Sequence, residues 1–308
     1  MVLKDKTRVI VTGGNGFIGS RLVDKLISLG FQVIVIDDLS AKCNEKFYFN
    51  NKAINHKVNI LDYDKIFPLF KDVDYVFHLA AESRIESAIQ NPCYTTRVNV
   101  EGTCNVLQAA REHNVKKVIY SSTSSVYGLT EKVPISEGEK IDCLNPYSAT
   151  KFAGEEMCRI YNKLYGLKTV IFRYFNVYGE GAPTKGHYAP VVGLFLKMAA
   201  NKEPLKIVGN GSQKRDFVHV QDIVDINIKV ALSENNDIGG EVFNIGCGKN
   251  VSILDLAKKI SNNHLFMPHR KGEAQQTLAN ITKVKKYFDW TPKIDLDTWI
   301  QQNLRKYK

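Results

Sequence analysis

The sequence predicts an α/β fold, in which a doubly wound parallel sheet carries a smaller α/β lobe. In the first 120 residues, short and continuously apolar segments alternate with stretches of helical spacing. Strands that are apolar throughout are typical of a parallel sheet whose two faces are both covered by helices. After about residue 175, glycine and proline become frequent, which is typical of a loop-rich lobe that wraps a ligand.

The individual elements follow in order along the chain. Residues 8–12 form the first apolar strand, and residues 17–29 have helical spacing that stops at Gly30, a C-cap signal. Later apolar strands are expected at residues 31–36, 73–79 and 118–121. A sheet of this kind binds ligands beyond the carboxyl ends of its strands.

The composition narrows the functional class. The chain has 308 residues, of which 44% are hydrophobic and 24% charged, and its formal net charge is +10. Its lysines and arginines are spread along the chain, whereas a nucleic-acid binder clusters them on one element. We therefore expect an anionic small substrate and no nucleic acid. The six cysteines form no C-x-x-C pair, and we expect no metal site.

The hydropathy pattern bears on location and on domains. No apolar run approaches the ~20 residues that span a membrane, and the first six residues lack the apolar region of a signal peptide. A cytoplasmic protein without a membrane partner is expected. We expect a cofactor-binding domain over 1–174, to which 216–246 returns, and a substrate-binding lobe made of 175–215 and 247–308.

A glycine-rich turn follows the first strand and opens the first helix. Gly13, Gly16 and Gly19 fit the pattern G-x-x-G-x-x-G. Such glycines allow a tight turn and a close backbone approach to a pyrophosphate, which the helix N-terminus then attracts. Asp37 ends the next strand, where a carboxylate accepts hydrogen bonds from ribose hydroxyls and repels a 2′-phosphate. These features predict a Rossmann fold that binds NAD rather than NADP.

Further motifs extend over essentially the whole chain. In order they are T-G-G-x-G-F-I-G-S at 12–20, His78-Leu79-Ala80-Ala81, Asn99-Val100-Glu101-Gly102-Thr103, Ser121-Ser122-Thr123, Tyr147-Ser148-Ala149-Thr150-Lys151, Arg173-Tyr174-Phe175-Asn176, Arg215-Asp216-Phe217-Val218-His219-Val220 and Arg270-Lys271-Gly272-Glu273. In these motifs the chain resembles the UDP-glucose 4-epimerase branch of the extended short-chain dehydrogenase/reductase family.

The candidate catalytic residues can also be argued from their chemistry. Tyr147 and Lys151 are four residues apart at the start of an expected helix, so they share one face. An ammonium beside a phenol favours the phenolate, and Lys151 is therefore expected to lower the pKa of Tyr147. Tyr147 would then act as a base near neutral pH, and Thr123 would hold the sugar hydroxyl or share its proton.

The resemblance implies a mechanism as well as a fold. Tyr147 removes the proton of the sugar 4-hydroxyl while hydride passes from carbon 4 to the nicotinamide, which gives a 4-keto sugar. The sugar turns over in the site and hydride returns to its opposite face. Because NAD is regenerated in each cycle, it is expected to stay bound. Members of the family are commonly homodimers, formed through helices that correspond to residues around 99–113 and 148–164.

The resemblance also assigns binding residues. Those expected at the cofactor are Gly13, Gly16, Phe17, Ile18, Gly19, Asp37, Asp38, Leu39, Ser40, Asn59, Ile60, Leu79, Ala80, Ala81, Asn99, Ser121, Ser122, Tyr147, Lys151 and Tyr174. Those expected at the nucleotide sugar are Arg84, Thr123, Tyr147, Asn176, Ala189, Val191, Lys206, Val208, Arg215, Arg270, Glu273 and Thr277. The two arginines 215 and 270 suit a diphosphate because a guanidinium offers forked donors.

Departures from the family pattern refine the expected reaction. Relatives that dehydrate sugars carry Asp-Glu where this chain has Ser124-Ser125, so simple dehydration is not expected. Arg84 could meet a diphosphate or a sugar carboxylate, so a UDP-uronic acid 4-epimerase is an alternative function. Another nucleotide-sugar epimerase, or a reductase that releases its cofactor, is an alternative on the same scaffold. A non-catalytic NAD-binding protein is a remote third alternative, because Thr123, Tyr147 and Lys151 are all present.

Position 277 bears on the sugar. Strict galactose-type relatives carry a tyrosine there that limits the space beside carbon 2, whereas this chain has Thr277. We therefore expect N-acetylated UDP-sugars to be accepted with, or instead of, UDP-glucose. His78 and His219 lie in apolar strands and are expected to be core residues.

Overall fold

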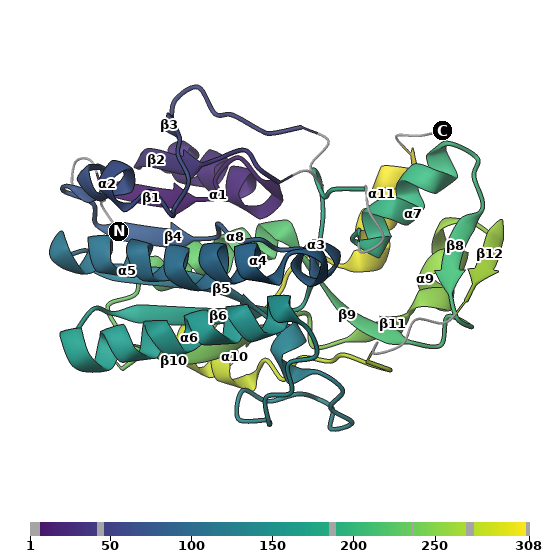
Figure 1. Ribbon diagram of the computed structural model, residues 1–308. Helices are drawn as coiled ribbons and strands as arrows, with labels where there is room; N and C mark the ends of the chain where they lie inside the picture. Colours follow the sequence, from purple (N-terminus) through teal and green to yellow (C-terminus); the bar gives the residue numbers. More distant parts are fainter. Residues whose placement is uncertain (1–6, 42–45, 185–188, 236, 269–273, 306–308) are drawn as a thin grey trace.

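The computed structural model describes residues 7–41, 46–184, 189–235, 237–268 and 274–305. It consists of a seven-stranded parallel sheet covered by helices, with a smaller lobe beside it (Figure 1). This arrangement confirms the predicted doubly wound α/β fold. In spatial order the strands are β3 (Ile54–Lys57), β2 (Gln32–Asp37), β1 (Arg8–Thr12), β4 (Tyr75–His78), β5 (Lys117–Thr123), β6 (Thr169–Tyr174) and β10 (Glu241–Ile245).

Alternate residues of each strand enter different cores, which explains why the strands are apolar throughout. In β1, Val9 and Val11 pack with the helices on one face, whereas Ile10 packs on the other. The first face is covered by α1 (Phe17–Ser28), α8 (Val220–Ala231) and α10 (Thr282–Phe288). The second is covered by α2 (Tyr63–Ile66), the 3₁₀ turn η1 (Phe67–Phe70), α5 (Gly102–Glu112) and α6 (Pro146–Tyr165).

Three short segments connect β4 to α5 and pack against α6. They are α3 (Ile85–Gln90), α4 (Pro92–Thr96) and the π-helical turn η2 (Arg97–Glu101). The 3₁₀ turn η3 (Ser124–Tyr127) follows β5 directly.

The smaller lobe has its own sheets and its own core. One sheet contains β11 (Asn250–Ser252), β9 (Lys214–His219) and β7 (Asn176–Tyr178), and a second pairs β12 (His264–Met267) with β8 (Leu205–Val208). Its helices are α7 (Val191–Ala200), α9 (Ile253–Ile260) and α11 (Leu296–Arg305). Phe195, Leu256 and Ile300, one from each helix, are fully buried together.

The chain passes between the two parts several times. β9 belongs to the lobe sheet, and α8 and β10 then return to the large sheet, where β10 pairs with β6. Within residues 247–308, α10 packs on the large sheet through Val284 and Phe288. The strand order reverses between β1 and β4, so their carboxyl ends form the crevice where a doubly wound sheet binds its ligand.

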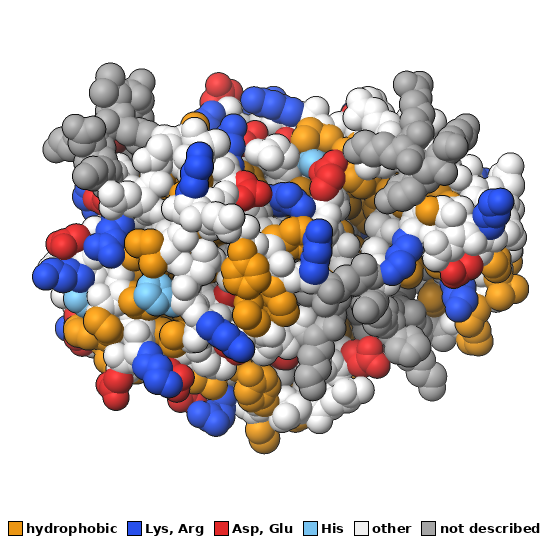
Figure 2. All heavy atoms as spheres, turned by 90° about the horizontal axis from the view of Figure 1, so that it is seen from above, with side chains coloured by type: hydrophobic (Ala, Val, Ile, Leu, Met, Phe, Trp, Pro, Cys, Tyr) orange, Lys and Arg blue, Asp and Glu red, His pale blue; other side chains and the backbone are white. Residues whose placement is uncertain are grey.

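The distribution of charged side chains on the surface agrees with the spread of lysines and arginines along the sequence. On the face in Figure 2, basic and acidic side chains are interspersed. None of the helices in the described part of the chain is long and apolar enough to cross a membrane.

Candidate active site

The turn after β1 is shaped by its glycines. Gly13 has a φ of +68°, and a Cβ on it would lie 2.8 Å from the backbone nitrogen of Ala80. A Cβ on Gly19 would lie 2.1 Å from the carbonyl oxygen of Gly13. Gly16 is the N-cap residue of α1 and has no side chain that could cap the helix. The first N–H groups of a helix have no acceptor within the helix itself, so they are available to a ligand. Bare backbone and a helix N-terminus fit a dinucleotide pyrophosphate.

Asp37 lies at the end of β2, beside this turn. Its Oδ2 accepts a hydrogen bond from the backbone nitrogen of Asn15 at 3.0 Å, and its Oδ1 accepts one from that of Leu39 at 2.9 Å. Burial raises the pKa of Asp37, although both hydrogen bonds act in the opposite direction. Each oxygen keeps a lone pair, so the carboxylate fits the ribose hydroxyls of NAD.

Four more of the residues expected at the cofactor, Asp38, Ser40, Asn59 and Ile60, lie close to β2 and α5. Asn59 donates from Nδ2 to Asp38 Oδ2 at 2.8 Å and accepts from the backbone nitrogen of Leu61 at 2.9 Å. Ser40 donates its backbone N–H to Asp38 Oδ1 at 2.9 Å. Ile60 is buried against Gly102 at the start of α5. The Asn59 amide keeps one N–H and one lone pair for a ligand.

His78 joins β1 and β4 at the crevice. Its Nδ1 lies 2.7 Å from Thr12 Oγ1, and its Nε2 lies 3.0 Å from Thr103 Oγ1. Because Thr103 Oγ1 donates to the Asn99 carbonyl at 2.7 Å, it accepts from Nε2–H, and Thr12 donates to Nδ1. Burial lowers the pKa of His78 to about 3, so the ring is neutral. The prediction of a core histidine is confirmed, and His219, which is 4% exposed, is also a buried residue with a lowered pKa.

The loop after β4 is held by Thr12 and Asn99. Thr12 Oγ1 accepts the backbone N–H groups of Leu79 and Ala80 at 3.2 and 3.1 Å. Asn99, in the π-helical turn η2, accepts from the Glu82 nitrogen at 2.8 Å and donates to the Glu82 carbonyl at 3.0 Å. It also donates to Thr150 Oγ1 at 3.0 Å, one residue before Lys151. Asn99 therefore ties this loop, which includes Ala81, to α6.

The catalytic candidates meet at the carboxyl end of β5. Helix α6 begins there because Asn145 and Ser148 form a capping box and Pro146 occupies the first turn. Tyr147 thus lies beside Thr123, the last residue of β5. On the neighbouring strand β6, Tyr174 Oη accepts from Ser121 Oγ of β5 at 3.2 Å and from Asn227 Nδ2 of α8 at 2.8 Å.

The expectation that Lys151 lowers the pKa of Tyr147 is wrong for this structure. Burial raises the pKa of Tyr147, and it outweighs a hydrogen bond with the Thr123 side chain and the charge of Arg84, which lower it. Lys151 lies with its Nζ 4.3 Å from the centre of the Tyr120 ring. Burial also lowers the pKa of Lys151 to about 8, so its ammonium is protonated near neutral pH.

Asn176, Thr277 and Asp216 meet where the lobe faces the large sheet. Asn176 Nδ2 donates to the Asp216 carbonyl at 2.8 Å and to Thr277 Oγ1 at 3.3 Å. The Asp216 carboxylate accepts three backbone N–H groups, from Cys247 at 2.6 Å and from Gly248 and Ala279 at 3.0 Å. Burial raises the pKa of Asp216 to about 6 against these hydrogen bonds.

The remaining substrate candidates lie around the lobe. Arg215, on β9 beside Asp216, is partly buried. Val191 begins α7 and Ala189 precedes its N-cap, while Lys206 and Val208 lie on β8. Arg84 is partly buried at the N-terminus of α3. Arg270 and Glu273 lie outside the described residues.

Sequence reasoning missed three contributors to the site. Asp216 stands in a quoted motif, but its carboxylate binds segments 31 and 63 residues away. Asn280 connects the segment after Thr277 to the loop at Ser136, since its Nδ2 donates to Ser136 Oγ at 3.0 Å. The third is a buried ion pair of Glu155 with Arg173. The sequence did contain one indication of this ion pair: Glu155 follows Lys151 by four residues and therefore lies on the same helix face.

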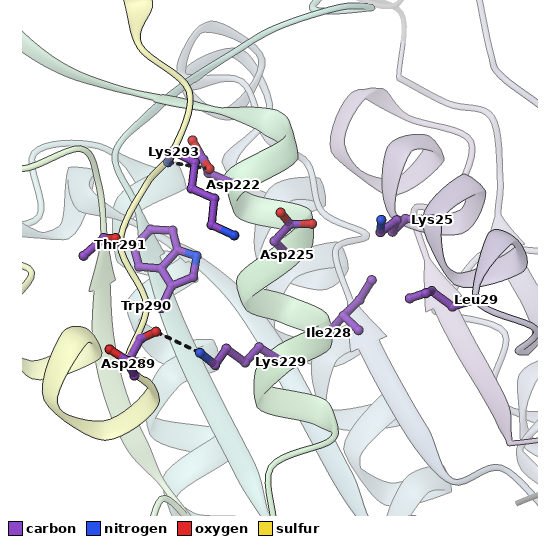
Figure 3. A pocket seen from close by; sticks show the side chains of 10 residues that line it. All are labelled: Lys25, Leu29, Asp222, Asp225, Ile228, Lys229, Asp289, Trp290, Thr291 and Lys293. Carbon is purple, nitrogen blue, oxygen red and sulfur yellow. Dashed lines mark hydrogen bonds between the residues drawn. The ribbon is translucent and has the colours of Figure 1, made fainter. Parts of the chain in front are cut away.

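A separate groove of about 310 Å³ lies between α1, α8 and the segment after α10, on the face of the sheet that these helices cover (Figure 3). Figure 3 shows Lys25 and Leu29 of α1 facing Asp225 and Ile228 of α8, whereas Lys229 points the other way, to the carbonyl of Asp289 beside Trp290. Basic and acidic groups alternate around the groove. The groove is therefore a surface feature between packed helices, apart from the crevice described above.

Known proteins resemble this chain in sequence and in fold. Residues 9–246 match the model of the NAD-dependent epimerase/dehydratase family. A UDP-glucose 4-epimerase of Mycolicibacterium smegmatis is 33% identical over 313 residues, which cover 98% of each chain. The UDP-glucose 4-epimerase of Thermotoga maritima, solved with UDP-glucose, superimposes with a TM-score of 0.90 at 32% identity, covering 97% of this chain and 98% of that one.

A third comparison concerns an N-acetylated substrate. The UDP-N-acetylglucosamine 4-epimerase of Methanobrevibacter ruminantium, solved with UDP-N-acetylmuramic acid, has a TM-score of 0.90 and 32% identity, with 98% of both chains covered. Because the family model spans most of the chain and the relatives exceed 30% identity over nearly all of it, this chain belongs to the NAD-dependent epimerase/dehydratase family and is UDP-glucose 4-epimerase-like within it.

Proposed function

We propose that this protein inverts the configuration at carbon 4 of a UDP-sugar, with NAD held throughout the cycle. The observation that carries the proposal is the position of Tyr147 and Thr123. They meet at the carboxyl end of β5, two strands from the glycine turn after β1. That arrangement supports a proton acceptor beside the crevice that would hold NAD.

The chain's own residues would divide the work as follows. Tyr147 takes the proton of the 4-hydroxyl and later returns it, while Thr123 hydrogen-bonds Tyr147 and the sugar hydroxyl. Lys151, which is 3% exposed, would add a buried positive charge on the same face of α6 as Tyr147. NAD, when bound, supplies the acceptor and donor of the hydride at carbon 4. Gly13, Gly19 and the N-terminus of α1 would hold its pyrophosphate.

The sugar and its diphosphate would lie between the large sheet and the lobe. Asn176 and Arg215 extend from lobe strands that adjoin the large sheet. A guanidinium there would bind diphosphate oxygens in a forked geometry. Val191 and Val208 would face the uracil, with Ala189 and Lys206 beside them.

We propose UDP-glucose and UDP-galactose as substrates, together with their N-acetylated forms. Thr277 supports this proposal because its short side chain is hydrogen-bonded to neighbouring residues of the lobe. Its Oγ1 accepts from Asn176 Nδ2 and from the Asp216 nitrogen, both at 3.3 Å. A threonine held in this way would leave space beside carbon 2 for an acetamido group.

A uronic acid is the second candidate substrate. Arg84 favours it, because its charge is close enough to lower the pKa of Tyr147 and is therefore near the sugar. A carboxylate at carbon 6 would form a charge-assisted hydrogen bond with such a group.

We also propose a cytoplasmic homodimer that pairs through α5 and α6. On α6, Ile160, Leu164 and Tyr165 are 41%, 65% and 45% exposed, which is a large apolar area for a helix surface. Light scattering on the purified protein would distinguish a dimer of about 70 kDa from the 34.8 kDa monomer. The division into a cofactor-binding domain and a nucleotide-sugar lobe, at the boundaries given above, remains part of the proposal.

The test is turnover without added cofactor. The purified protein is incubated with UDP-galactose, UDP-N-acetylgalactosamine or UDP-galacturonic acid, and the anomeric NMR signals are followed. Formation of the gluco epimers would support epimerisation with retained NAD, and the three rates would rank the substrates. Turnover that occurs only with added NAD(P)H, or none with any substrate, would contradict the proposal.

Tyr147→Phe tests the proposed base. Turnover should fall by at least about 100-fold, because the general base is lost. Bound NAD per protomer should be unchanged. Tyr287→Phe, which removes the hydroxyl of a partly exposed tyrosine on α10, is the matched control and should keep wild-type turnover. Wild-type turnover in Tyr147→Phe would refute the assignment.

A further inference from the structure

A buried ion pair involves the face of α6 that carries Tyr147 and Lys151, one turn beyond Lys151. Glu155 and Arg173 are 0% and 1% exposed. Arg173 Nη2 lies 2.6 Å from Glu155 Oε2, and Nε lies 3.0 Å from Oε1, which is a forked geometry. Ser122 Oγ donates to Oε1 at 2.5 Å. Both carboxylate oxygens are therefore hydrogen-bonded.

The guanidinium is equally well enclosed. Arg173 Nη1 donates to the carbonyl of Glu137 at 3.2 Å, and the guanidinium carbon lies 4.8 Å from the centre of the Tyr127 ring. Desolvation offsets most of the attraction within a buried pair, so apolar residues of similar size stabilise a fold about as well. Stability alone therefore gives little reason for two charges here.

The position of the pair suggests another reason. Ser122 and Arg173 are register partners on β5 and β6, and the next register pair contains Thr123. Glu155 thus joins α6 to two strands at one level, one residue below Thr123. One turn earlier on the same helix is Lys151, and two turns earlier is Tyr147.

A second contact brings the helix close to β5 at this level. The Tyr120 hydroxyl donates to the Lys151 carbonyl at 3.2 Å. A Cβ on Gly154 would lie 2.2 Å from that hydroxyl oxygen, so only glycine allows this approach. The helix is therefore anchored to the sheet at Gly154 and Glu155, immediately after Lys151.

We propose that Glu155 and Arg173 are a positioning pair, which fixes the distance and register of α6 against β5 so that Tyr147 and Lys151 are held in reach of Thr123. The inference rests on the proposed function, because it concerns the same catalytic residues. Neither member of the pair touches the sugar or NAD; each acts through α6.

The pair also sets the charge around Lys151. The groups that face Lys151 are Glu155 and Cys158 on α6, Tyr120 on β5 and His78 on β4. Burial lowers the pKa of Lys151, while Glu155 acts to raise it. Removing the carboxylate charge should therefore lower the pKa of Lys151 further, an effect that Arg173, left without its partner, would strengthen.

The test compares Glu155→Gln with Glu156→Gln. Glu156 is the next residue of α6, where it forms an exposed ion pair with Arg159, so its variant is the matched control. For each protein, kcat and KM are measured from pH 6 to 10 and normalised to folded protein that contains NAD. Thermal unfolding and bound NAD are measured in parallel.

Glu155→Gln should lower kcat by about 10- to 100-fold, as expected for a shift of the catalytic groups by ~1 Å, with KM within about threefold. The alkaline limb of its pH profile should move down by roughly one unit. Glu156→Gln should match the wild type. If Glu155→Gln keeps the wild-type kcat and pH profile and only unfolds earlier, the pair is merely structural and the inference is overturned.

A neutral double variant covers the case in which Glu155→Gln does not fold. Glu155→Gln/Arg173→Met leaves no buried charge unpaired, so it should fold. Its kcat should still be at least about 10-fold reduced, because α6 has lost its anchor; a wild-type kcat would overturn the inference. The proposed function is tested separately, by turnover of the wild type without added cofactor. A wild type that passes that test, together with slowed variants, supports the positioning role.

Discussion

We expect Gly19→Ala to weaken the binding of NAD at the N-terminus of α1. The added Cβ would lie 2.1 Å from the carbonyl oxygen of Gly13 and 2.8 Å from Gly14 Cα, both of which are backbone atoms. Ordinary contact needs about 3.5 Å, so the start of α1 must move by about 1.4 Å relative to the turn. A backbone N–H displaced by that distance no longer hydrogen-bonds a phosphate oxygen.

The magnitude follows from the number of hydrogen bonds lost. Two charge-assisted hydrogen bonds, at about 1.5–3 kcal/mol each, correspond to an affinity for NAD at least ~100-fold lower. Overpacking should cost a further ~1–3 kcal/mol of folding stability. The purified variant should therefore contain little NAD, measured after denaturation, whereas the wild type should contain about one per protomer.

Gly138→Ala is the matched control for this substitution. A Cβ on Gly138 meets nothing within 4 Å, so the variant should keep its NAD and its stability. If Gly19→Ala copurifies with a full complement of NAD and titrates with wild-type affinity, then either the turn yields without cost or the pyrophosphate lies elsewhere. The assignment of the glycine turn would then be refuted.

Two other predictions concern stability. The folded-state pKa of His78 is lowered to about 3, whereas the pKa of a histidine in the unfolded chain is ~6.5. As the pH falls from ~6.5 toward about 3, the unfolded chain therefore binds a proton at His78 that the folded protein does not bind, and folding stability is lost. Urea unfolding should show about 2 kcal/mol less stability at pH 5 than at pH 7 from this group, and His78→Gln should lack this component; equal pH dependence in both proteins would contradict it. Lys117 is 4% exposed and donates to the Val230 and Ser233 carbonyls at the end of α8, both at 2.8 Å. Lys117→Met should cost about 2–3 kcal/mol in the same assay while kcat stays unchanged, because Lys117 lies at the opposite end of β5 from Thr123; a lowered kcat would be inconsistent with this.

Local patterns predicted the elements that form the cofactor crevice. The apolar run at 8–12 became β1, and the run at 31–36 became β2 with its bounds moved by one residue. Gly13 and Gly19 could be interpreted from sequence because the positive φ of Gly13 and the contact of Gly19 with Gly13 and Gly14 are local constraints. The order of motifs was enough to identify the family.

The missed features depend on which distant residues meet. Arg173 and Glu155 are 18 residues apart and on different elements, and Asp216 binds Ala279 at a separation of 63 residues. No local pattern shows that such side chains share a buried place. The pKa of Tyr147 was mispredicted for a related reason: spacing showed Lys151 on the same face, but burial dominates the pKa, and burial is a property of the packed structure.

A series of buried hydrogen bonds connects the glycine turn to the helix that carries Tyr147. His78 bridges Thr12 at the end of β1 to Thr103 on α5, and Thr103 in turn binds Asn99, which reaches Thr150 on α6. Each member is satisfied by the next, so displacing one leaves a buried donor or acceptor without its partner. The turn that would hold the pyrophosphate and the helix that carries Tyr147 are therefore joined by one chain of hydrogen bonds. A substitution in this chain should change both cofactor retention and turnover, whereas one at Lys117 should change stability alone.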